Sequence, residues 1–514
     1  MSSLMPMPLP EPALDTIVAI STPPGRGGIG IVRLSGPDAL TIAAQLLHLT
    51  GPLDDPKAHA RARRARVLDP GNDAHTIDDA LVTAFLAPHS YTGDTLVEIA
   101  AHGSPVILDA ILRSALAHGA RLALPVRLAT PGEFTQRAFL SGRLDLTQAE
   151  AVHDLIAAQT LDQARVAAQQ LGGAISRRVA PAKESLLHLI ALLEAGMDFA
   201  SGELDDVDIV PPAQIAAAIA SVQQPLDALA ATFRRGQLLR NGAAIALIGP
   251  PNAGKSSLFN RLLDRERAIV TPLPGTTRDT IEESLSLAGI PLRLIDTAGL
   301  RTVSVPHPAS SPGDDAHGAN PPIDAAELLG IARSHEALAD ADLVLLIHDA
   351  TQPLTPAELH LAASLAEPGT ARPHLIIHTK IDLLPNTEGA GGFSTLKKTA
   401  IEGALAPGLS PTPIPTSALT GFGLDDLRQA ILAQLGATGS LAATGSLNNL
   451  RQQQAITETL AALSAATAAT AAALPHELIL LDLHTALHAL DSLTGATTPD
   501  GILARIFSTF CIGK

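Results

Sequence analysis

The stretch "GPPNAGKSS" (residues 249–257) decides the fold of the middle of this chain. It follows the apolar run "AAIALI" and opens the helical pattern "SSLFNRLL". A Gly-x-x-x-x-Gly-Lys-Ser sequence between a strand and a helix predicts a P-loop, whose glycines let backbone N–H groups approach phosphates. Lys255 is then placed to reach the β and γ phosphates, and the Ser256 hydroxyl is placed to bind Mg²⁺.

Two segments further along the chain have the pattern of phosphate-sensing loops. "LRLIDTAG" (292–299) predicts a strand that delivers Asp296 to the metal shell and leaves the N–H of Gly299 to sense the γ-phosphate. "TPLPGTTRD" (271–279) places Thr277 to complete the Mg²⁺ shell. We expect this second loop to order when a triphosphate is bound.

Two later segments predict guanine recognition. In "LIIHTKID" (375–382), Asp382 can accept two hydrogen bonds from the guanine edge, whereas adenine would leave the carboxylate badly paired. The usual motif is Asn-Lys-x-Asp, and Thr379 replaces the Asn, as in some guanine-specific GTPases. "TSALTG" (416–421) then offers backbone groups to the base. The predicted nucleotide contacts are Asn252, Ala253, Gly254, Lys255, Ser256, Ser257, Thr271, Pro272, Leu273, Pro274, Gly275, Thr276, Thr277, Asp296, Thr297, Ala298, Gly299, Thr379, Lys380, Asp382, Ser417, Ala418 and Leu419, with Mg²⁺ on Ser256 and Thr277.

The hydrolytic group is not evident from these motifs. Leu300 follows Asp-Thr-Ala-Gly, where many GTPases carry a glutamine that orients the attacking water. The sequence also shows no obvious arginine finger. Asn252 occupies the P-loop position that binds K⁺ in some GTPases, and a monovalent cation there would neutralise charge in the transition state.

The pattern along the 514 residues separates into several regions. Short strand-like runs with a helix predict an α+β domain, Ala- and Leu-rich stretches predict a helical domain, and alternating strands and helices predict an inserted α/β domain. The predicted regions are an N-terminal extension (1–13), an α+β domain (14–132), a first helical part (133–240), a Ras-like P-loop GTPase domain (241–436), a Gly/Ser linker (437–449) and a second helical part (450–514). The fold class is therefore multidomain α/β and α, with one helical domain formed from two chain segments.

Composition limits the compartment and the partners. A single cysteine excludes an internal disulfide and fits a reducing compartment. The N-terminus lacks the pattern of a signal peptide, and the apolar stretch 460–474 is a helix rich in Ala and Thr that stops at Pro475, so we expect a soluble cytoplasmic protein. The net charge is −16, and "RARRAR" (61–66) is the one basic cluster. If the protein acts on RNA, we expect most contacts with the RNA backbone to come from another molecule.

Two patterns resemble sites but are better explained structurally. "GRGGIG" (25–30) matches Gly-x-Gly-x-x-Gly, but a strand follows it instead of a helix, which favours a turn between strands. His484 and His488 have the spacing of zinc ligands, but neither the usual Glu nor a third ligand accompanies them, which favours core or surface histidines.

The single cysteine lies in the tail "IFSTFCIGK" (506–514). Cys511 has the spacing of a prenylation site, but Gly513 and Lys514 do not suit that signal. Two alternatives remain: a small side chain that only packs, and a functional thiol on a tail docked at an active site.

Taken with the GTPase motifs, "TIVAISTPPGRGGIGIVRLSG" (16–36), "PGEFTQRAFLSGRLDLTQAEAV" (131–152) and the terminal "FCIGK" resemble the tRNA-modification GTPase family MnmE, also called TrmE. The likeness extends from about residue 15 to residue 514. It implies a homodimer, formed through the N-terminal domain, that joins the FAD-dependent partner MnmG in a heterotetramer. Together they would add an aminomethyl or carboxymethylaminomethyl group at the 5-position of the wobble uridine of certain tRNAs. The resemblance also implies K⁺-dependent GTP hydrolysis, with 5,10-methylenetetrahydrofolate or a 5-formyl folate analogue in the folate site.

The same resemblance implies roles for individual residues. Glu327 would orient the attacking water, and Cys511 would act as nucleophile or acid/base on a helical tail near the folate site. The implied folate ligands are Arg33, Glu98, Arg143 (where the family often has Lys) and Lys514, and the implied K⁺ ligands are Asn252, Thr271, Leu273 and Thr276. The chain departs from the family at 302–322, where five prolines with Gly, Ser and Asp predict a disordered insertion within the switch.

Two other functions fit parts of the sequence. One is a GTP-driven switch in ribosome assembly or stress signalling, which leaves the N-terminal domain and "FCIGK" without a role. The other is a folate-dependent one-carbon transferase that acts on a small molecule and is regulated by GTP. Nucleoside analysis of tRNA separates the three.

Overall fold

The structure is a computed structural model. It describes residues 15–49, 51–69, 72–200, 210–266, 282–296, 341–366, 372–384, 412–437, 445–498 and 500–513. The chain forms two compact units. The first unit combines Met1–Ala157, Ala167–Ala230 and Arg451–Lys514, and the second combines Ala158–Val166 and Ala231–Leu450.

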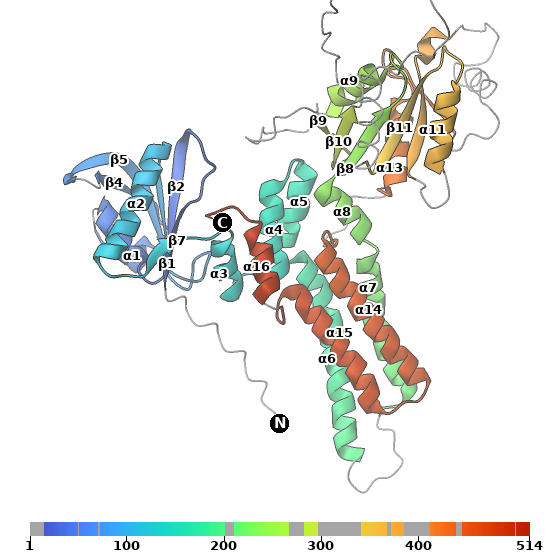
Figure 1. The fold of residues 1–514 in the computed structure, drawn as a ribbon. Helices are drawn as coiled ribbons and strands as arrows, with labels where there is room; N and C mark the ends of the chain where they lie inside the picture. The colour runs from blue at the N-terminus through green and yellow to red at the C-terminus, as the bar shows by residue number, and fades with distance from the viewer. Residues whose placement is uncertain are drawn as a thin grey trace, which may run out of the picture. The chain divides into compact units, whose positions relative to one another are not determined.

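A seven-stranded sheet forms the N-terminal part of the first unit (Figure 1). Its strand order is β3-β4-β5-β6-β2-β1-β7, and all neighbours are antiparallel except β1 and β7. The strands are β1 (Thr16–Ile20), β2 (Gly27–Ser35), β3 (Leu47–Leu49), β4 (Arg63–Asp69), β5 (Asn72–Phe85), β6 (Leu96–Gly103) and β7 (Val126–Leu128).

One face of this sheet is covered by two helices. They are α1 (Ala39–Leu46) and α2 (Pro105–Arg121), and a short 3-10 helix, η1 (Pro56–Ala58), lies in the loop before β4. Side chains of both helices, such as Ile42 and Ile111, are buried in one core with alternate residues of β2 and β6. This alternation follows from the period of two in a strand.

Among the described residues, a helix covers the opposite face at one end only. There α3 (Glu133–Leu140) inserts Phe134 into a small cluster with Ile17 of β1 and Leu96 of β6. Ile29 of β2 and Leu81 of β5 are 69% and 54% exposed. This half of the sheet is therefore an open face with apolar side chains.

The helices of the first unit come from both ends of the chain. α15 packs on α6, and α6 packs on α7. Buried residues of α15 recur every three or four positions, from Ile479 to Leu493, as expected for one apolar helix face. The helices are α4 (Leu146–Ala157), α5 (Leu161–Leu171), α6 (Ala174–Ala200), α7 (Pro212–Ala230), α14 (Leu450–Ala471), α15 (His476–Thr494) and α16 (Asp500–Ser508), and part of α5 is assigned to the second unit.

An ion pair also joins the two helical segments. Arg451 of α14 contacts the carboxylate of Glu150 of α4 at 2.7 and 3.0 Å, and Gln452 donates to the same carboxylate at 2.9 Å. Because Glu150 is buried, these three bonds replace the water that the charge would otherwise need.

The second unit contains a six-stranded sheet in the order β13-β12-β11-β8-β10-β9 (Figure 1). Only the β9–β10 hairpin is antiparallel. The strands are β8 (Ala243–Ile248), β9 (Glu282–Leu287), β10 (Ile290–Asp296), β11 (Leu343–Asp349), β12 (His374–Thr379) and β13 (Ile414–Pro415).

Helices cover both faces of this second sheet. Leu258 of α9 and Leu427 of α13 share a core with Ile245 of β8, whereas Leu365 of α11 packs with Ala246 on the other side. All six residues of β8 are buried, as expected for a parallel strand covered on both faces. The helices are α8 (Phe233–Asn241), α9 (Lys255–Glu266), α11 (Pro356–Ala366), α13 (Leu424–Leu435) and the 3-10 helix η2 (Ile381–Leu383).

The predicted fold class is confirmed: an α+β domain, helices from two chain segments and a P-loop α/β domain are all present. The domain boundaries given above stay predictions. Of the glycines at 25–30, which were expected to form a turn between strands, Gly25 lies in the turn before β2, whereas Gly27, Gly28 and Gly30 lie within β2. Among the described helices, none is long and apolar enough to cross a membrane.

Candidate nucleotide site and C-terminal tail site

The P-loop joins β8 to α9 at the carboxyl edge of the parallel strands. Asn252 adopts a left-handed conformation with φ of 62°, at the position predicted to bind K⁺. The Lys255 ammonium group is buried and donates to the carbonyl oxygens of Gly249 and Pro250, both at 2.8 Å. Ser256 is exposed in the first turn of α9, where its hydroxyl is accessible to an ion.

The guanine motif is bonded to the P-loop. The Thr379 hydroxyl lies 2.5 Å from the carbonyl oxygen of Ala253 and 3.0 Å from that of His348, and its single hydrogen is shared between them. The Lys380 ammonium group donates to the carbonyl oxygen of Asn252 at 2.7 Å. Thr379 is 3% exposed, so a short hydroxyl donor fills the space at the position where Asn is usual.

Asp349, which belongs to none of the predicted motifs, holds Lys380 in place. Its carboxylate contacts the Lys380 ammonium group at 2.7 Å. Burial raises the pKa of Asp349, but hydrogen bonds from Lys380 and Thr351 outweigh burial and lower the pKa. The only sequence signal was an acidic residue at the carboxyl end of an apolar strand, beside the strand that leads into Thr-Lys-x-Asp.

The residues expected to contact the base follow two neighbouring strands. Asp382 is half-buried in η2, directly after β12. Ser417 follows β13, is fully buried, and accepts a hydrogen bond from the N–H of Thr420 at 3.1 Å. Because β12 and β13 pair, both segments emerge at one edge of the sheet. Leu419 is 81% exposed.

Several predicted residues lie outside the described part of the chain. They are Thr271, Pro272, Leu273, Pro274, Gly275, Thr276, Thr277, Thr297, Ala298, Gly299, Glu327 and Lys514, together with the insertion 302–322. The backbone of Asp296 ends β10, but its side chain is outside the description. Their roles stay predictions.

The folate ligands expected in the N-terminal sheet include a directly paired couple. Arg33 of β2 and Glu98 of β6 face each other across the strands, and their side chains form an ion pair at 2.7 Å. These side chains are 19% and 25% exposed, so the pair is accessible from the open face. Arg143 is exposed in the turn between α3 and α4.

The C-terminal tail reaches this pair. Arg33 donates to the carbonyl oxygen of Gly513 at 3.3 Å. The Cys511 carbonyl oxygen accepts a hydrogen bond from the N–H of Gly132 at 3.3 Å. The structure therefore brings Arg33, Glu98 and the backbone of the cysteine tail together.

Two expectations about the tail are corrected. Cys511 was expected on a helix, but α16 ends at Ser508 and the cysteine lies in the turn beyond it. The alternative of a packing cysteine also disagrees with the structure, because Cys511 is exposed. Phe510 occupies the buried position instead, with its ring centroid 5.6 Å from that of Phe507.

The histidine pair of α15 is a surface feature. His484 and His488 are exposed, and His484 contacts Glu194 at 3.2 Å. Among the described residues there is no group of three His, Cys, Asp or Glu side chains placed to hold a metal ion.

The P-loop, its bonds to Thr-Lys-x-Asp and the parallel sheet define a GTPase domain. Two families match the chain: "GTP-binding protein TrmE N-terminus" over residues 16–143 and "MnmE helical domain" over residues 146–511. The chain belongs to the tRNA modification GTPase MnmE family.

Individual relatives cover nearly the whole chain. A tRNA modification GTPase MnmE from Koribacter versatilis is 48% identical over 97% of this chain and 99% of the relative. One from Chloroflexus aurantiacus is 41% identical over 97% of this chain and 100% of the relative. Among solved structures, the G domain of the T. maritima FeoB iron transporter is 28% identical over 37% of this chain and 98% of that one, with a TM-score of 0.24.

Proposed function

We propose that this tRNA modification GTPase is a cytoplasmic, K⁺-dependent enzyme that works with the FAD-dependent partner MnmG. Together they add an aminomethyl or carboxymethylaminomethyl group at the 5-position of the wobble uridine of certain tRNAs. One observation supports the modification chemistry most strongly. The tail with the only cysteine accepts a hydrogen bond from Arg33 of the Arg33–Glu98 pair, where a functional thiol and a ligand would meet.

The nucleotide site fits GTP with Mg²⁺. Hydroxyl oxygens are ligands that Mg²⁺ accepts, and Ser256 presents one beside Lys255 at the start of α9. Lys255 and the helix N-terminus would neutralise phosphate charge, and Thr277 would complete the metal shell. Asn252, held by Lys380 through its carbonyl group, would keep its side chain free for K⁺, with Thr271, Leu273 and Thr276 as further ligands.

The Arg33–Glu98 pair fits a folate. A carboxylate accepts hydrogen bonds from pterin N–H groups, and guanidinium groups bind the glutamate carboxylates of folates. A bound folate would supply the one-carbon unit. In our proposal Glu98 orients the pterin, Arg33, Arg143 and Lys514 hold carboxylates, and Cys511 moves a proton or attacks as a thiolate.

Two surface features support the proposed partners. The open sheet face with exposed Ile29 and Leu81 supports the proposal that two copies dimerise through the N-terminal domain. The basic cluster 61–66 is partly occupied, since Arg63 binds backbone carbonyls and Arg64 pairs with Asp79. With a net charge of −16, tRNA would be gripped mainly by MnmG in a heterotetramer.

Glu327→Ala should lower GTP hydrolysis by roughly 100-fold while GTP still binds, because a water-orienting carboxylate acts only in the hydrolytic step. The measurement is the single-turnover rate in K⁺, with a fluorescent nucleotide for affinity. Asp324→Ala, in the same segment, is the matched control and should hydrolyse GTP at the wild-type rate. If Glu327→Ala hydrolyses GTP at the wild-type rate, Glu327 is not the carboxylate that orients the attacking water.

Cys511→Ser should abolish wobble modification without affecting GTP hydrolysis, because a serine hydroxyl is a far poorer nucleophile and acid than a thiol. The measurement is mass spectrometry of digested tRNA from a deletion strain that carries either wild type or the variant. The modified uridine should disappear on deletion and return only with wild type. If the deletion leaves every wobble nucleoside intact, the modification function is wrong and a GTPase switch takes its place.

A further inference from the structure

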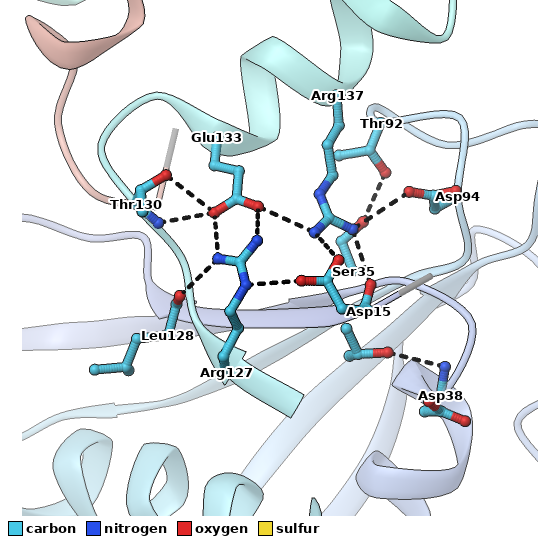
Figure 2. A network of polar contacts seen from close by, with 11 residues as sticks. Asp15, Ser35, Asp38, Thr92, Asp94, Arg127, Leu128, Thr130, Glu133 and Arg137 are labelled. Atoms are coloured by element: carbon cyan, nitrogen blue, oxygen red, sulfur yellow. Dashed lines mark hydrogen bonds and ion pairs between the residues drawn. The ribbon is translucent and has the colours of Figure 1, made fainter. Parts of the chain in front are cut away.

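A partly buried network of charges lies at the beginning of α3, next to the tail (Figure 2). The Glu133 carboxylate is 8% exposed and contacts the two terminal guanidinium nitrogens of Arg127, at 2.6 and 2.8 Å. It also accepts from Arg137 at 3.0 Å, and Arg137 donates in turn to the carboxylate of Asp15 at 2.7 Å. Glu133 thus ties α3 to β7 and to the residue before β1.

Glu133 also fixes the turn before its own helix. Its Oε2 atom accepts from the N–H of Thr130 at 2.8 Å and from the Thr130 hydroxyl at 3.1 Å, as Figure 2 shows. Ala129, one residue earlier, is buried and donates to the carbonyl oxygen of Val18 at 3.0 Å. The turn 129–132 is therefore held to the sheet on one side and to Glu133 on the other.

The far end of this turn carries the tail. Gly132 has φ of +70° and donates its N–H to the Cys511 carbonyl oxygen. A Cβ atom on Gly132 would lie 2.5 Å from the carbonyl oxygen of Phe507 and 3.0 Å from Cβ of Phe510. Only glycine allows the tail to pack this closely on the turn.

A second contact fixes the tail just beyond the cysteine. Gly513 has φ of +90°, and a Cβ atom there would lie 2.6 Å from the carbonyl oxygen of Ile20. Arg33 donates to its carbonyl group. Since consecutive Cα atoms are 3.8 Å apart, the Cα atom of Cys511 lies within about 7.6 Å of that of Gly513. The exposed thiol therefore stands on a backbone that is held on both sides.

We propose that Glu133 is a positioning residue for the thiol of Cys511. Through the turn 129–132, its carboxylate holds the tail so that the thiol stays within reach of the Arg33–Glu98 pair. The chemical use of that thiol rests on the proposed function, but its placement does not. Removing the charge of Glu133 releases Thr130, and the turn 129–132 then no longer holds the tail in place.

The test uses Cys511 as a unique label site, because it is the only cysteine of the chain. A nitroxide attached to Cys511 of the full-length protein should show an immobilised spectrum in wild type. It should become mobile in Glu133→Gln and in Gly132→Ala, which act at opposite ends of the turn. Asp109→Asn removes an exposed ion pair on α2 and is the matched control, with the wild-type spectrum expected.

Thr130→Val keeps the test decisive if Glu133→Gln fails to fold, because it deletes one bond to Glu133 and leaves the ion pairs intact. A smaller gain in label mobility is expected for it. A folded Glu133→Gln with the wild-type spectrum overturns the proposal. If Glu133→Gln does not fold, an unchanged spectrum in Thr130→Val overturns it.

The unlabelled variants separate this inference from the proposed function. Misplacement of a reacting group by about 1 Å costs on the order of 100-fold in rate, so the turnover of tRNA modification should fall about 10- to 100-fold with KM for tRNA unchanged. GTP hydrolysis without tRNA should stay at the wild-type rate. If the label becomes mobile but the turnover of tRNA modification is unchanged, Cys511 has no role in the proposed function. The positioning of the tail by Glu133 is then still supported. If wild type modifies no tRNA, the proposed function fails and the label spectra still decide the positioning.

Discussion

Asp382→Asn should move the nucleotide preference of this chain from GTP to XTP. A carboxylate accepts both N–H donors of the guanine edge, and the amide of Asn would leave one of them facing a second donor. Xanthine carries an oxygen in place of the guanine amino group, so Asn can accept from one position and donate to the other. Because buried polar groups without partners are costly, we expect the affinity for GTP to fall by about 100-fold or more.

The measurement is the Kd for fluorescent GTP and XTP in both proteins. Asp382 follows Thr379 and Lys380, which bind the P-loop carbonyls, so the variant should leave the P-loop intact. Asp425→Asn is a control with an exposed carboxylate on α13 and should keep the preference for GTP. An equal loss of affinity for both nucleotides would mean that Asp382 supports the loop and does not read the base.

Neutralising Glu133 should remove much of the acid-sensitive stability of the N-terminal part. Burial raises the pKa of Glu133, but hydrogen bonds from Arg127, Thr130 and Arg137 outweigh it and lower the pKa from 4.5 to about 2. Because the pKa of Glu133 is lower in the folded state, its charged carboxylate stabilises the fold above the unfolded pKa of about 4.5. This stabilisation is lost as the pH falls toward 2. The difference corresponds to roughly 3 kcal/mol at neutral pH.

Hydrogen exchange of the α3 amides between pH 7 and pH 2 measures this part of the chain separately from the GTPase domain. Glu133→Gln should exchange faster than wild type at pH 7, after correction for the intrinsic rate, and the two should converge near pH 2. Asp94 has the opposite sign, because burial raises its pKa, and it shares Arg137 with Glu133. If the two proteins still differ in exchange rate at pH 2, the effect comes from the changed packing of the side chain and not from its charge.

The GTPase domain was largely predictable because its signals are local. The P-loop, the Asp-Thr-Ala-Gly segment and Thr-Lys-x-Asp each place a residue on a known side of a strand or a helix end. Asp349 escaped notice because a lone acidic residue after a strand has no sequence signature. It became recognisable only when β11 and β12 were paired and its carboxylate met Lys380.

The tail shows the opposite case. The sequence placed Cys511 on a helix, but the helical pattern carries no information on where packing ends it. Phe507 and Phe510 are both buried, and the chain turns after Ser508 to seat them. The outcome is an exposed thiol where a buried one was an alternative.

The sequence alone determined the class of the chain, its GTPase motifs and the isolated cysteine near its end, because each depends on residues close together or on composition. Tertiary structure decided that Arg33 meets Glu98, that Gly132 supports the tail and that Glu133 gathers two guanidinium groups. These contacts join residues separated by 65, 379 and up to 6 positions, and even the short separation needs a strand and a helix to meet. Pairing of side chains across a fold depends on strand register and helix packing, which no local pattern encodes.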